Sequence, residues 1–218
     1  MRWLILLLFV LAVPVATAAT ISVCYNYGCL AEAPADYSEQ QLAQVRDLIA
    51  AADSAAAERD RLALAIGWLL AWAGQQTPIA ADRGGNRADD GGYGRMDCID
   101  HATTTTRLLR LLDARGWLHF HRVLEPVRRV RYLFAVHFSA QIEEIDGRRE
   151  TTAGGSPNAD PARFVVDSWF RDNGQPAVVM ALPDWLDGEG REETAQLSGV
   201  ADRPDDGWSP SHAYEGGE

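Results

Sequence analysis

Apolar residues recur with the period of a helix in two segments of the first half of the chain. Over residues 42–49 they lie three or four positions apart, and Ser38 with Gln41 forms a capping-box pattern just before them. The segment from Ala55 to Trp72 is rich in alanine and leucine, and a glycine follows it as a stop. This pattern predicts two consecutive helices.

A third helical pattern begins at Cys98, continues to about Arg115 and has Gly116 as its C-terminal stop. Its apolar stripe consists of Leu108, Leu109, Leu111 and Leu112. Before it, residues 75–94 are rich in Gly and Asp and predict a long loop. Loops of this length within a compact domain are usually functional or mobile. We therefore expect this loop either to line a cleft beside Cys98 or to be an uninvolved surface loop.

Strand patterns replace helical ones after Gly116. Residues 117–124 alternate, and Val130 to Ile145 form a long apolar segment that predicts a single strand. The remaining predicted elements are a hairpin turn at 146–147 with a return at 148–152, strands at 163–170 and 177–182, and a short helix at 183–186. Helices followed by an antiparallel sheet predict an α+β domain over residues 20–187.

The N-terminus has the pattern of a secretory signal peptide. A positively charged start precedes an apolar run at residues 4–15, and small residues follow up to Ala19. This predicts a signal peptide over residues 1–19, cleaved after Ala18 or Ala19. A transmembrane anchor is the alternative, but the run is short for a full span and Pro14 interrupts it.

Charge is concentrated at the other end of the chain. The 218 residues carry a formal net charge of -11, and the segment from Asp184 to Glu218 holds ten acidic residues and two arginines. Residues 188–218 therefore predict an acidic, flexible tail. No basic patch dominates, so composition gives no support for a nucleic-acid partner. No segment after the signal peptide has the length of a bilayer span, and the sequence indicates no oligomeric state.

The chain contains three cysteines. Cys24 and Cys29 lie close together, and in an exported protein a tight disulfide loop is the simplest account of such a pair. Cys98 is then unpaired, and it is either a reactive thiol or a buried bystander. Its place at a helix start favours reactivity, because unpaired backbone N–H groups and the helix dipole stabilise a thiolate there.

Two later strand-like segments supply partners for Cys98. His137 lies in the first and Asp167 in the second. A thiolate, an imidazole that moves its proton and a carboxylate that orients the imidazole are the components of cysteine-based acyl transfer. The alternatives are that His137 is a core histidine and that Asp167 starts a turn or pairs with Arg171. We expect Asp100 to be a first-turn carboxylate that stabilises the helix.

His119 and His121 alternate along one predicted strand, so their side chains point the same way. With Cys98 or His137 they would suggest zinc. No Cys-x-x-Cys or His-Glu-x-x-His pattern accompanies them. The sequence therefore predicts neither a metal site nor a cofactor, and a zinc-binding protein is a minor alternative.

The residues around the nucleophile follow a Cys-x-Asp-x-Ala, Leu-Leu-Arg and Gly rhythm, carried here by Cys98, Asp100, Ala102, Leu108, Leu109, Arg110 and Gly116. His137 and Asp167 follow at spacings of 39 and 30 residues. This order resembles the bacterial transglutaminase-like cysteine proteinases, a branch of the transglutaminase-like superfamily with a papain-like fold. The chain departs from the family pattern at Met96, where glycine is frequent, and at Ser139, where an aromatic residue is frequent.

The resemblance implies a nucleophile-bearing helix packed on an antiparallel sheet and a Cys98–His137–Asp167 triad. It also implies an exported cysteine peptidase or amidase, or an acyl transferase, that works through a thioester on a peptide or protein substrate of the bacterial cell envelope. The expected location is the periplasm or the medium. The oxyanion donors would be the Cys98 N–H and a second group, for which Gln75 and Gln76 are candidates. The alternative is a catalytically inactive binding module that docks through the loop before Cys98.

Overall fold

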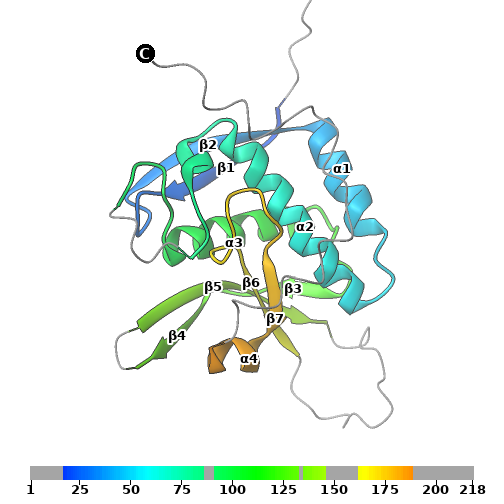
Figure 1. Cartoon of the computed structure of the whole chain (residues 1–218). Coiled ribbons are helices and arrows are strands. Elements are labelled where there is room, and N and C mark those ends of the chain that lie inside the picture. Colours follow the sequence, from blue (N-terminus) through cyan, green and yellow to red (C-terminus); the bar gives the residue numbers. More distant parts are fainter. Residues whose placement is uncertain (1–16, 86–90, 133–134, 146–161, 189–218) are drawn as a thin grey trace, which may run out of the picture.

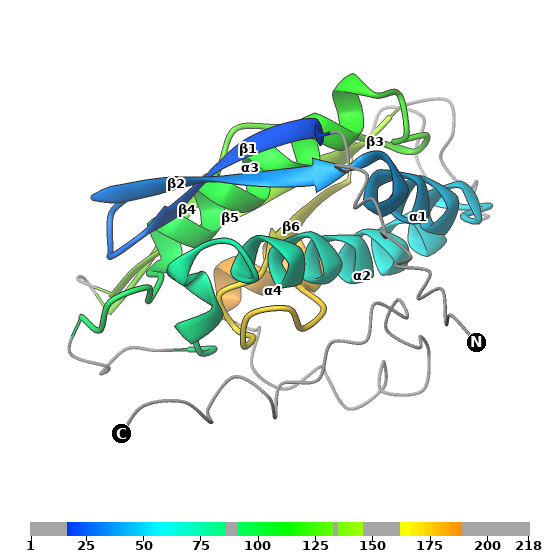
Figure 2. The ribbon, with the colours of Figure 1, turned by 90° about the horizontal axis from the view of Figure 1, so that it is seen from above.

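A computed structural model of the chain describes residues 17–85, 91–132, 135–145 and 162–188, and these residues form an α+β fold (Figure 1). A helix, α3 (Cys98–Ala114), lies between a two-stranded hairpin on one side and a larger antiparallel sheet on the other. Figure 2 shows the hairpin running over α3, with α2 alongside it. The α+β fold class predicted from the sequence is thus confirmed, while a papain-like arrangement stays a prediction.

The hairpin consists of β1 (Thr17–Tyr25) and β2 (Ala31–Ser38), which pair antiparallel. The sequence analysis predicted no strands before the first helix. The alternation in β2 is carried mainly by small residues, with Ala35 and Tyr37 buried on its inner face, so its hydrophobic signal is weak. Most of the predicted signal peptide lies outside the described residues. Cleavage after Ala18 or Ala19 would leave the greater part of β1 in place.

The helices confirm the local signals. Helix α1 (Glu39–Ala50) has the capping box of Ser38 and Gln41, and α2 (Ala55–Gly74) begins after Ser54, whose side chain accepts a hydrogen bond from the N–H of Ala57. Helix α2 is apolar on nearly all sides because it is buried along most of its length. A short 3-10 helix, η1 (Pro78–Ala81), follows it and begins the connection to α3.

The larger sheet has the strand order β3-β5-β6-β7, with β4 paired to β5, and every pairing is antiparallel. Its strands are β3 (His121–Val123), β4 (Val127–Arg131), β5 (Ala135–Glu144), β6 (Arg163–Asp167) and β7 (Val178–Ala181). The chain ends its described part with α4 (Leu182–Asp187), which contacts β6 and β7. Helix α3 packs against β5 on the inner face of this sheet.

The prediction of one strand from Val130 to Ile145 is wrong. The chain reverses within this segment, and Val130 on β4 pairs with Val136 on β5. Tyr132 adopts a positive φ of 50° at the end of β4. The segment contains no Gly, Pro, Asn or Asp before position 146, so the usual turn residues did not mark the reversal. The hairpin expected at 146–152 and residues 189–218 of the expected tail lie outside the described residues.

The core joins all of these layers. The main cluster combines α1, α2 and α3 with the hairpin and the inner face of the sheet, and a smaller cluster around Trp185 lies between α4, β6 and β7. Within the described ranges, no helix is both long enough and apolar enough to cross a bilayer. The start of α3 lies where the hairpin and the sheet both approach it, which sets the surroundings of Cys98.

Candidate functional site

Cys98 is the first residue of α3, as predicted. The N-cap residue Asp97 accepts hydrogen bonds from the N–H groups of Ile99 and Asp100, each at 2.9 Å, and the Asp100 carboxylate accepts one from the Asp97 N–H at 3.1 Å. This is a capping box in which both side chains are acidic. The N–H of Cys98 takes no part in it, and it lowers the pKa of the neighbouring Cys98 thiol.

His137 and Asp167 lie on adjacent strands and contact each other. Nε2 of His137 is 2.7 Å from Oδ2 of Asp167, and both side chains are buried. The carboxylate also accepts hydrogen bonds from Nε1 of Trp185 at 2.9 Å and from the Trp169 N–H at 3.2 Å. Such a carboxylate holds the imidazole by one nitrogen, which leaves Nδ1 as the nitrogen for a second partner.

Three aromatic rings surround the His137 imidazole. The ring centroids of Trp169, Phe170 and Trp185 lie 4.7, 5.4 and 5.6 Å from the imidazole centroid. Rings at these distances limit the rotation of the imidazole and exclude water from the hydrogen bond to Asp167. The sequence analysis did not predict this enclosure, although Trp169 and Phe170 follow Asp167 closely in the chain.

Cys98 lies beside this pair. A backbone hydrogen bond from Phe138, the residue after His137, reaches the Cys98 thiol. Phe138 pairs with Arg128 of β4, but it has no partner in the β5–β6 ladder, which begins only at Ala140. Within the described residues, no hydrogen bond joins the Cys98 sulfur to the His137 ring. The structure thus brings His137 and Asp167 into contact and places Cys98 next to them, and the catalytic role of the three residues stays a prediction.

The pKa of the Cys98 thiol is shifted in the direction opposite to the one that its place at a helix start predicts. Burial raises the pKa of Cys98 above its ordinary value of 9.0, and the negative charges of Asp97 and Asp167 act in the same direction. The backbone hydrogen bonds from Phe138 and from Cys98 itself lower the pKa but do not reverse this shift. The helix start therefore does not by itself make Cys98 a thiolate, because desolvation outweighs the N–H groups.

A second buried network lies one helical turn along α3. Nε2 of His101 is 2.9 Å from Oδ2 of Asp82, and Nδ1 of His101 is 2.8 Å from Oγ of Ser168. Ser168 also contacts Oγ1 of Thr105 at 2.9 Å, and Asp82 accepts a hydrogen bond from the Met96 N–H. The network ties α3 to the residue that follows Asp167 and to the loop before Cys98. The spacing of His101 three residues after Cys98 was the available sequence signal, and it was not used.

The histidines considered for zinc are engaged in a third network. Nδ1 of His121 is 2.9 Å from Oε1 of Glu58, and Nε2 of His121 is 3.3 Å from the Arg59 guanidinium. Glu58 is fully buried and also accepts hydrogen bonds from the N–H groups of His119 and Phe120. Both ring nitrogens of His121 thus have protein partners, which leaves no nitrogen for a metal ion.

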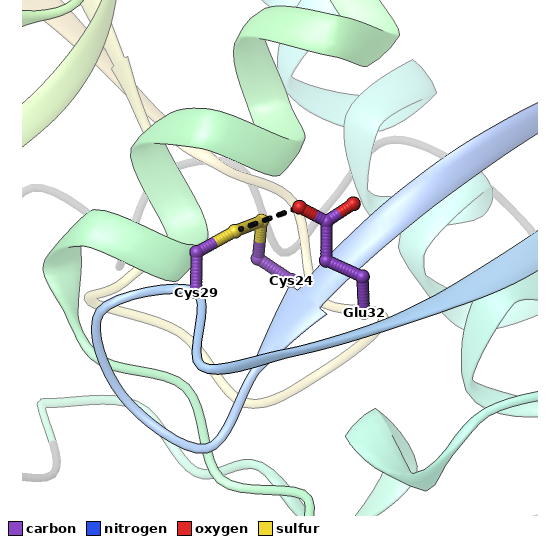
Figure 3. A group of neighbouring side chains, drawn as sticks. All are labelled: Cys24, Cys29 and Glu32. Atoms are coloured by element: carbon purple, nitrogen blue, oxygen red, sulfur yellow. Dashed lines mark hydrogen bonds between the residues drawn. A yellow bond between two sulfur atoms is a disulfide. The ribbon is translucent and has the colours of Figure 1, made fainter.

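Within the described ranges, the one cluster of metal-type ligands is Cys24, Cys29 and Glu32 (Figure 3). The two cysteines form the predicted disulfide, with their Cα atoms 4.7 Å apart. Sulfurs bonded to each other are not the thiolate ligands that a metal site needs. The minor zinc alternative has no support in this geometry.

Glu58 makes stability depend on pH. Burial raises the pKa of Glu58, but the hydrogen bonds from His121 and the two backbone N–H groups outweigh it, and the net shift is below the ordinary 4.5. A carboxyl with a lowered folded pKa stabilises the fold above its unfolded pKa, and this contribution is lost as the pH falls through the folded value. The glutamate therefore favours the folded state at neutral pH.

We expect Glu58→Gln to lower the unfolding free energy at neutral pH by about 3 kcal/mol, because His121 loses its charged partner. The further loss on acidification below 4.5 becomes shallower than in the wild type. Urea unfolding at neutral and acidic pH measures both effects. Glu39→Gln, at an exposed position in the first turn of α1, is the matched control. Parallel pH curves for the wild type and Glu58→Gln would contradict the assignment.

The structure treats the two candidates for the second oxyanion donor, Gln75 and Gln76, differently. The Gln76 amide is fully occupied, since Nε2 donates to the carbonyls of Asp36 and Trp72 and Oε1 accepts the Asp36 N–H. It holds β2 to α2, and its prediction as an oxyanion donor is wrong. Gln75 is the C-cap residue of α2, and its role stays a prediction.

No protein-family model, curated protein or solved structure matches the chain. The resemblance to the transglutaminase-like cysteine proteinases therefore stays a prediction that rests on the residues around Cys98, His137 and Asp167.

Proposed function

We propose that the protein is an exported cysteine hydrolase, a peptidase or amidase, or a related acyl transferase. Cys98 is the nucleophile, His137 the base and acid, and Asp167 the residue that orients the imidazole. The observation that carries the proposal is the buried 2.7 Å hydrogen bond between His137 and Asp167, beside a cysteine at the start of α3. The order of these residues supports it, since a helix with Cys precedes strands with His and Asp.

The proposed proton transfer follows from the hydrogen bond that already occupies Nε2 of His137. Asp167 accepts the Nε2–H of His137, so the neutral imidazole takes the Cys98 proton at Nδ1 while the sulfur attacks a carbonyl carbon. The carbonyl electrons move to the oxygen, and the N–H of Cys98 donates to the resulting oxyanion. The intermediate collapses to a thioester when the leaving amine takes the proton from Nδ1. Water then releases the acid, or an amine takes up the acyl group.

The resting site holds a thiol and a neutral imidazole in this proposal. Burial favours this pair because it raises the pKa of Cys98 and penalises two separated charges. Proton transfer then accompanies attack on the substrate, when the Cys98 sulfur and the imidazole come together. This differs from cysteine enzymes that hold a preformed thiolate–imidazolium pair.

The disulfide supports export. A bond between Cys24 and Cys29 persists in oxidising compartments, which agrees with the secretory pattern at the N-terminus. We accordingly propose a periplasmic or secreted location in a bacterium, with a peptide or protein of the cell envelope as the substrate.

A second candidate function is a catalytically inactive binding module. Two observations favour it, namely the raised pKa of Cys98 and the missing hydrogen bond between Cys98 and His137 in the described part of the chain. Such a module would retain the surroundings of Cys98 with an ordinary thiol.

The rate of Cys98 alkylation by iodoacetamide, measured against pH, separates the two functions. If His137 accepts the thiol proton, the wild-type rate rises at a lower pH than the rate of His137→Ala does. In His137→Ala the inflection lies above the ordinary thiol pKa of 9.0, because burial and the charges of Asp97 and Asp167 outweigh the backbone hydrogen bonds to the thiol. A wild-type inflection already above 9.0, unchanged by the substitution, would refute catalysis by this pair and favour the binding module.

A further inference from the structure

The loop between β1 and β2 (Figure 1) forms hydrogen bonds with the first turn of α3, which carries Cys98. Its residues Asn26, Tyr27, Gly28 and Cys29 all have positive φ values between 60° and 66°. Three of the four are not glycine, and L-residues adopt this conformation only when their surroundings require it. The disulfide between Cys24 and Cys29 closes the loop.

The loop donates three backbone hydrogen bonds to the two carboxylates that cap α3. The N–H of Tyr27 lies 2.8 Å from Oδ2 of Asp100, and the N–H of Cys29 donates to Oδ1 of the same residue. The N–H of Gly28 lies 3.0 Å from Oδ2 of Asp97. Asp97 and Asp100 flank Cys98 in the chain, so the loop holds the helix on both sides of the nucleophile.

Further contacts extend this hold before and after the first turn. Asn26 donates its N–H to the Arg95 carbonyl at 2.8 Å and accepts the Gly94 N–H at 2.9 Å. The N–H of Cys24 donates to Oγ1 of Thr104 at 3.0 Å. The loop thus contacts the chain before Cys98, the first turn of α3 and the turn after it.

The carboxylates depend on these donors. Asp100 is fully buried, and burial is the largest cause of its raised pKa, which the N–H groups of Cys29, Asp97 and Tyr27 oppose. A buried carboxylate that loses two of its donors costs free energy or takes up a proton. Either change weakens the capping box that begins α3 at Cys98.

We propose that the Cys24–Cys29 disulfide is a redox-sensitive clamp that positions Cys98, and that its reduction by a dithiol lowers the reactivity of the nucleophile. The clamp rests on the proposed function of Cys98. It defines Asp97 and Asp100 as positioning residues, since both carboxylates cap the helix that carries Cys98.

The surroundings of the two sulfurs determine the course of the reduction. Cys29 is partly exposed, whereas Cys24 is fully buried. The Arg107 guanidinium lies 3.4 Å from Sγ of Cys24. A Glu32 carboxylate oxygen lies 3.5 Å from Sγ of Cys29 (Figure 3). Arg107 is the largest cause of the lowered pKa of Glu32, so this group is a carboxylate. A negative charge is thus stabilised on Cys24 and disfavoured on Cys29.

The exchange therefore begins at Cys29. One thiolate of the dithiol attacks Sγ of Cys29, the bond between the two cysteines breaks, and its electron pair goes to Cys24, where Arg107 stabilises the thiolate. The second thiolate of the dithiol then attacks the dithiol sulfur that is bonded to Cys29. This releases Cys29 as a thiolate, which takes a proton from water. The protein gains two electrons, and the dithiol leaves as a disulfide.

The test compares the full chain before and after reduction with dithiothreitol, which is then removed without air. Mass spectrometry of the peptides that contain residues 97–101 follows both amide hydrogen exchange and the alkylation of Cys98. We expect reduction to speed amide exchange over 97–101 by on the order of tenfold. We expect it to slow the His137-dependent alkylation of Cys98 by a similar factor, with exchange in α1 unchanged. Equal exchange over 97–101 in the two states would overturn the clamp.

Variants add independent readouts. Cys24→Ser with Cys29→Ser is expected to reproduce the reduced state without a reductant. Arg107→Gln is expected to slow the reduction of the disulfide several-fold, because the leaving Cys24 thiolate loses its cation. Arg110→Gln is the matched control, since Arg110 lies one turn further along α3 and pairs with the exposed Glu125. Equal reduction rates in Arg107→Gln and the wild type would contradict the proposed course.

The two proposals fail in different ways. Alkylation that depends on His137 equally in both redox states would overturn the clamp and leave the proposed function intact. Equal alkylation rates of Cys98 in the wild type and His137→Ala, with amide exchange over 97–101 that is still faster after reduction, would overturn the proposed function. The disulfide would then be a clamp on α3 alone.

Discussion

Asp167→Asn is expected to lower the rate of acyl transfer to Cys98 by on the order of a thousandfold. The asparagine amide has the shape of the carboxylate, but its NH₂ group donates to Nε2 of His137, where Asp167 accepts. The imidazole then carries its proton on Nδ1, which can no longer accept the proton of Cys98. The amide oxygen, in the place of Oδ1, still accepts the hydrogen bond from the Trp169 N–H. The Nε1–H of Trp185 loses its acceptor, because it shares Oδ2 with His137, so we expect the variant to fold with a stability loss of about 1–2 kcal/mol.

Acetylation of Cys98 by p-nitrophenyl acetate, followed by mass spectrometry at short times, measures this effect without a known natural substrate. Asp172→Asn is the matched control, since Asp172 is exposed and accepts a hydrogen bond from the Gly84 N–H. We expect this control to react at the wild-type rate. If Asp167→Asn reacted as fast as the wild type, Asp167 would have no role in orienting the imidazole.

Trp185→Ala is expected to lower the unfolding free energy by about 3–5 kcal/mol. Trp185 is fully buried on α4, where it packs in the smaller core cluster with Val165, Val178 and Met180. The substitution removes the largest side chain of this cluster and leaves a cavity. It also removes a ring beside His137 and a hydrogen bond to Asp167.

Urea unfolding measures the loss, and two variants isolate its causes. Trp185→Phe keeps most of the ring and loses the Nε1 donor, so its loss is expected to be about 1–2 kcal/mol. Leu186→Ala, at the next and largely exposed position, is expected to cost about 0.5 kcal/mol or less. A loss for Trp185→Ala as small as that of Leu186→Ala would show that α4 is not part of the stable core.

Local signals predicted the helices well. The starts of α1 and α3 depend on residues within three positions of each other, Ser38 with Gln41 and Asp97 with Asp100. The start of α3 at Cys98 was therefore predictable, although the capping partners of this helix were not identified. Gly116, with its positive φ of 70°, also marks the end of α3 as predicted.

Strands were predicted less well, because pairing joins residues that are distant in the chain. The strands β1 and β2 form the hairpin that covers α3, yet small residues carry the alternation of β2. The reversal between β4 and β5 lacks the usual turn residues, so one continuous apolar segment gave no sign of it. In both places the stabilising contacts lie across the pair rather than along the strand.

The described structure contains three buried pairs of histidine and carboxylate. His137 pairs with Asp167, His101 with Asp82, and His121 with Glu58. Only the first was predicted, and the order of residues along the chain predicted it. The other two join residues whose spacings of 19 and 63 positions follow no local rule.

The sequence by itself determined where the helices begin, which cysteines pair and which chemical groups the chain contains, because these follow from neighbouring residues. Tertiary structure alone decided which acid each histidine contacts, that the disulfide loop lies on the first turn of α3, and that desolvation raises the pKa of Cys98. The physical reason is that desolvation and long-range hydrogen bonds depend on what packs around a group. For Cys98, which is half-buried, desolvation outweighs the helix start that the sequence reveals.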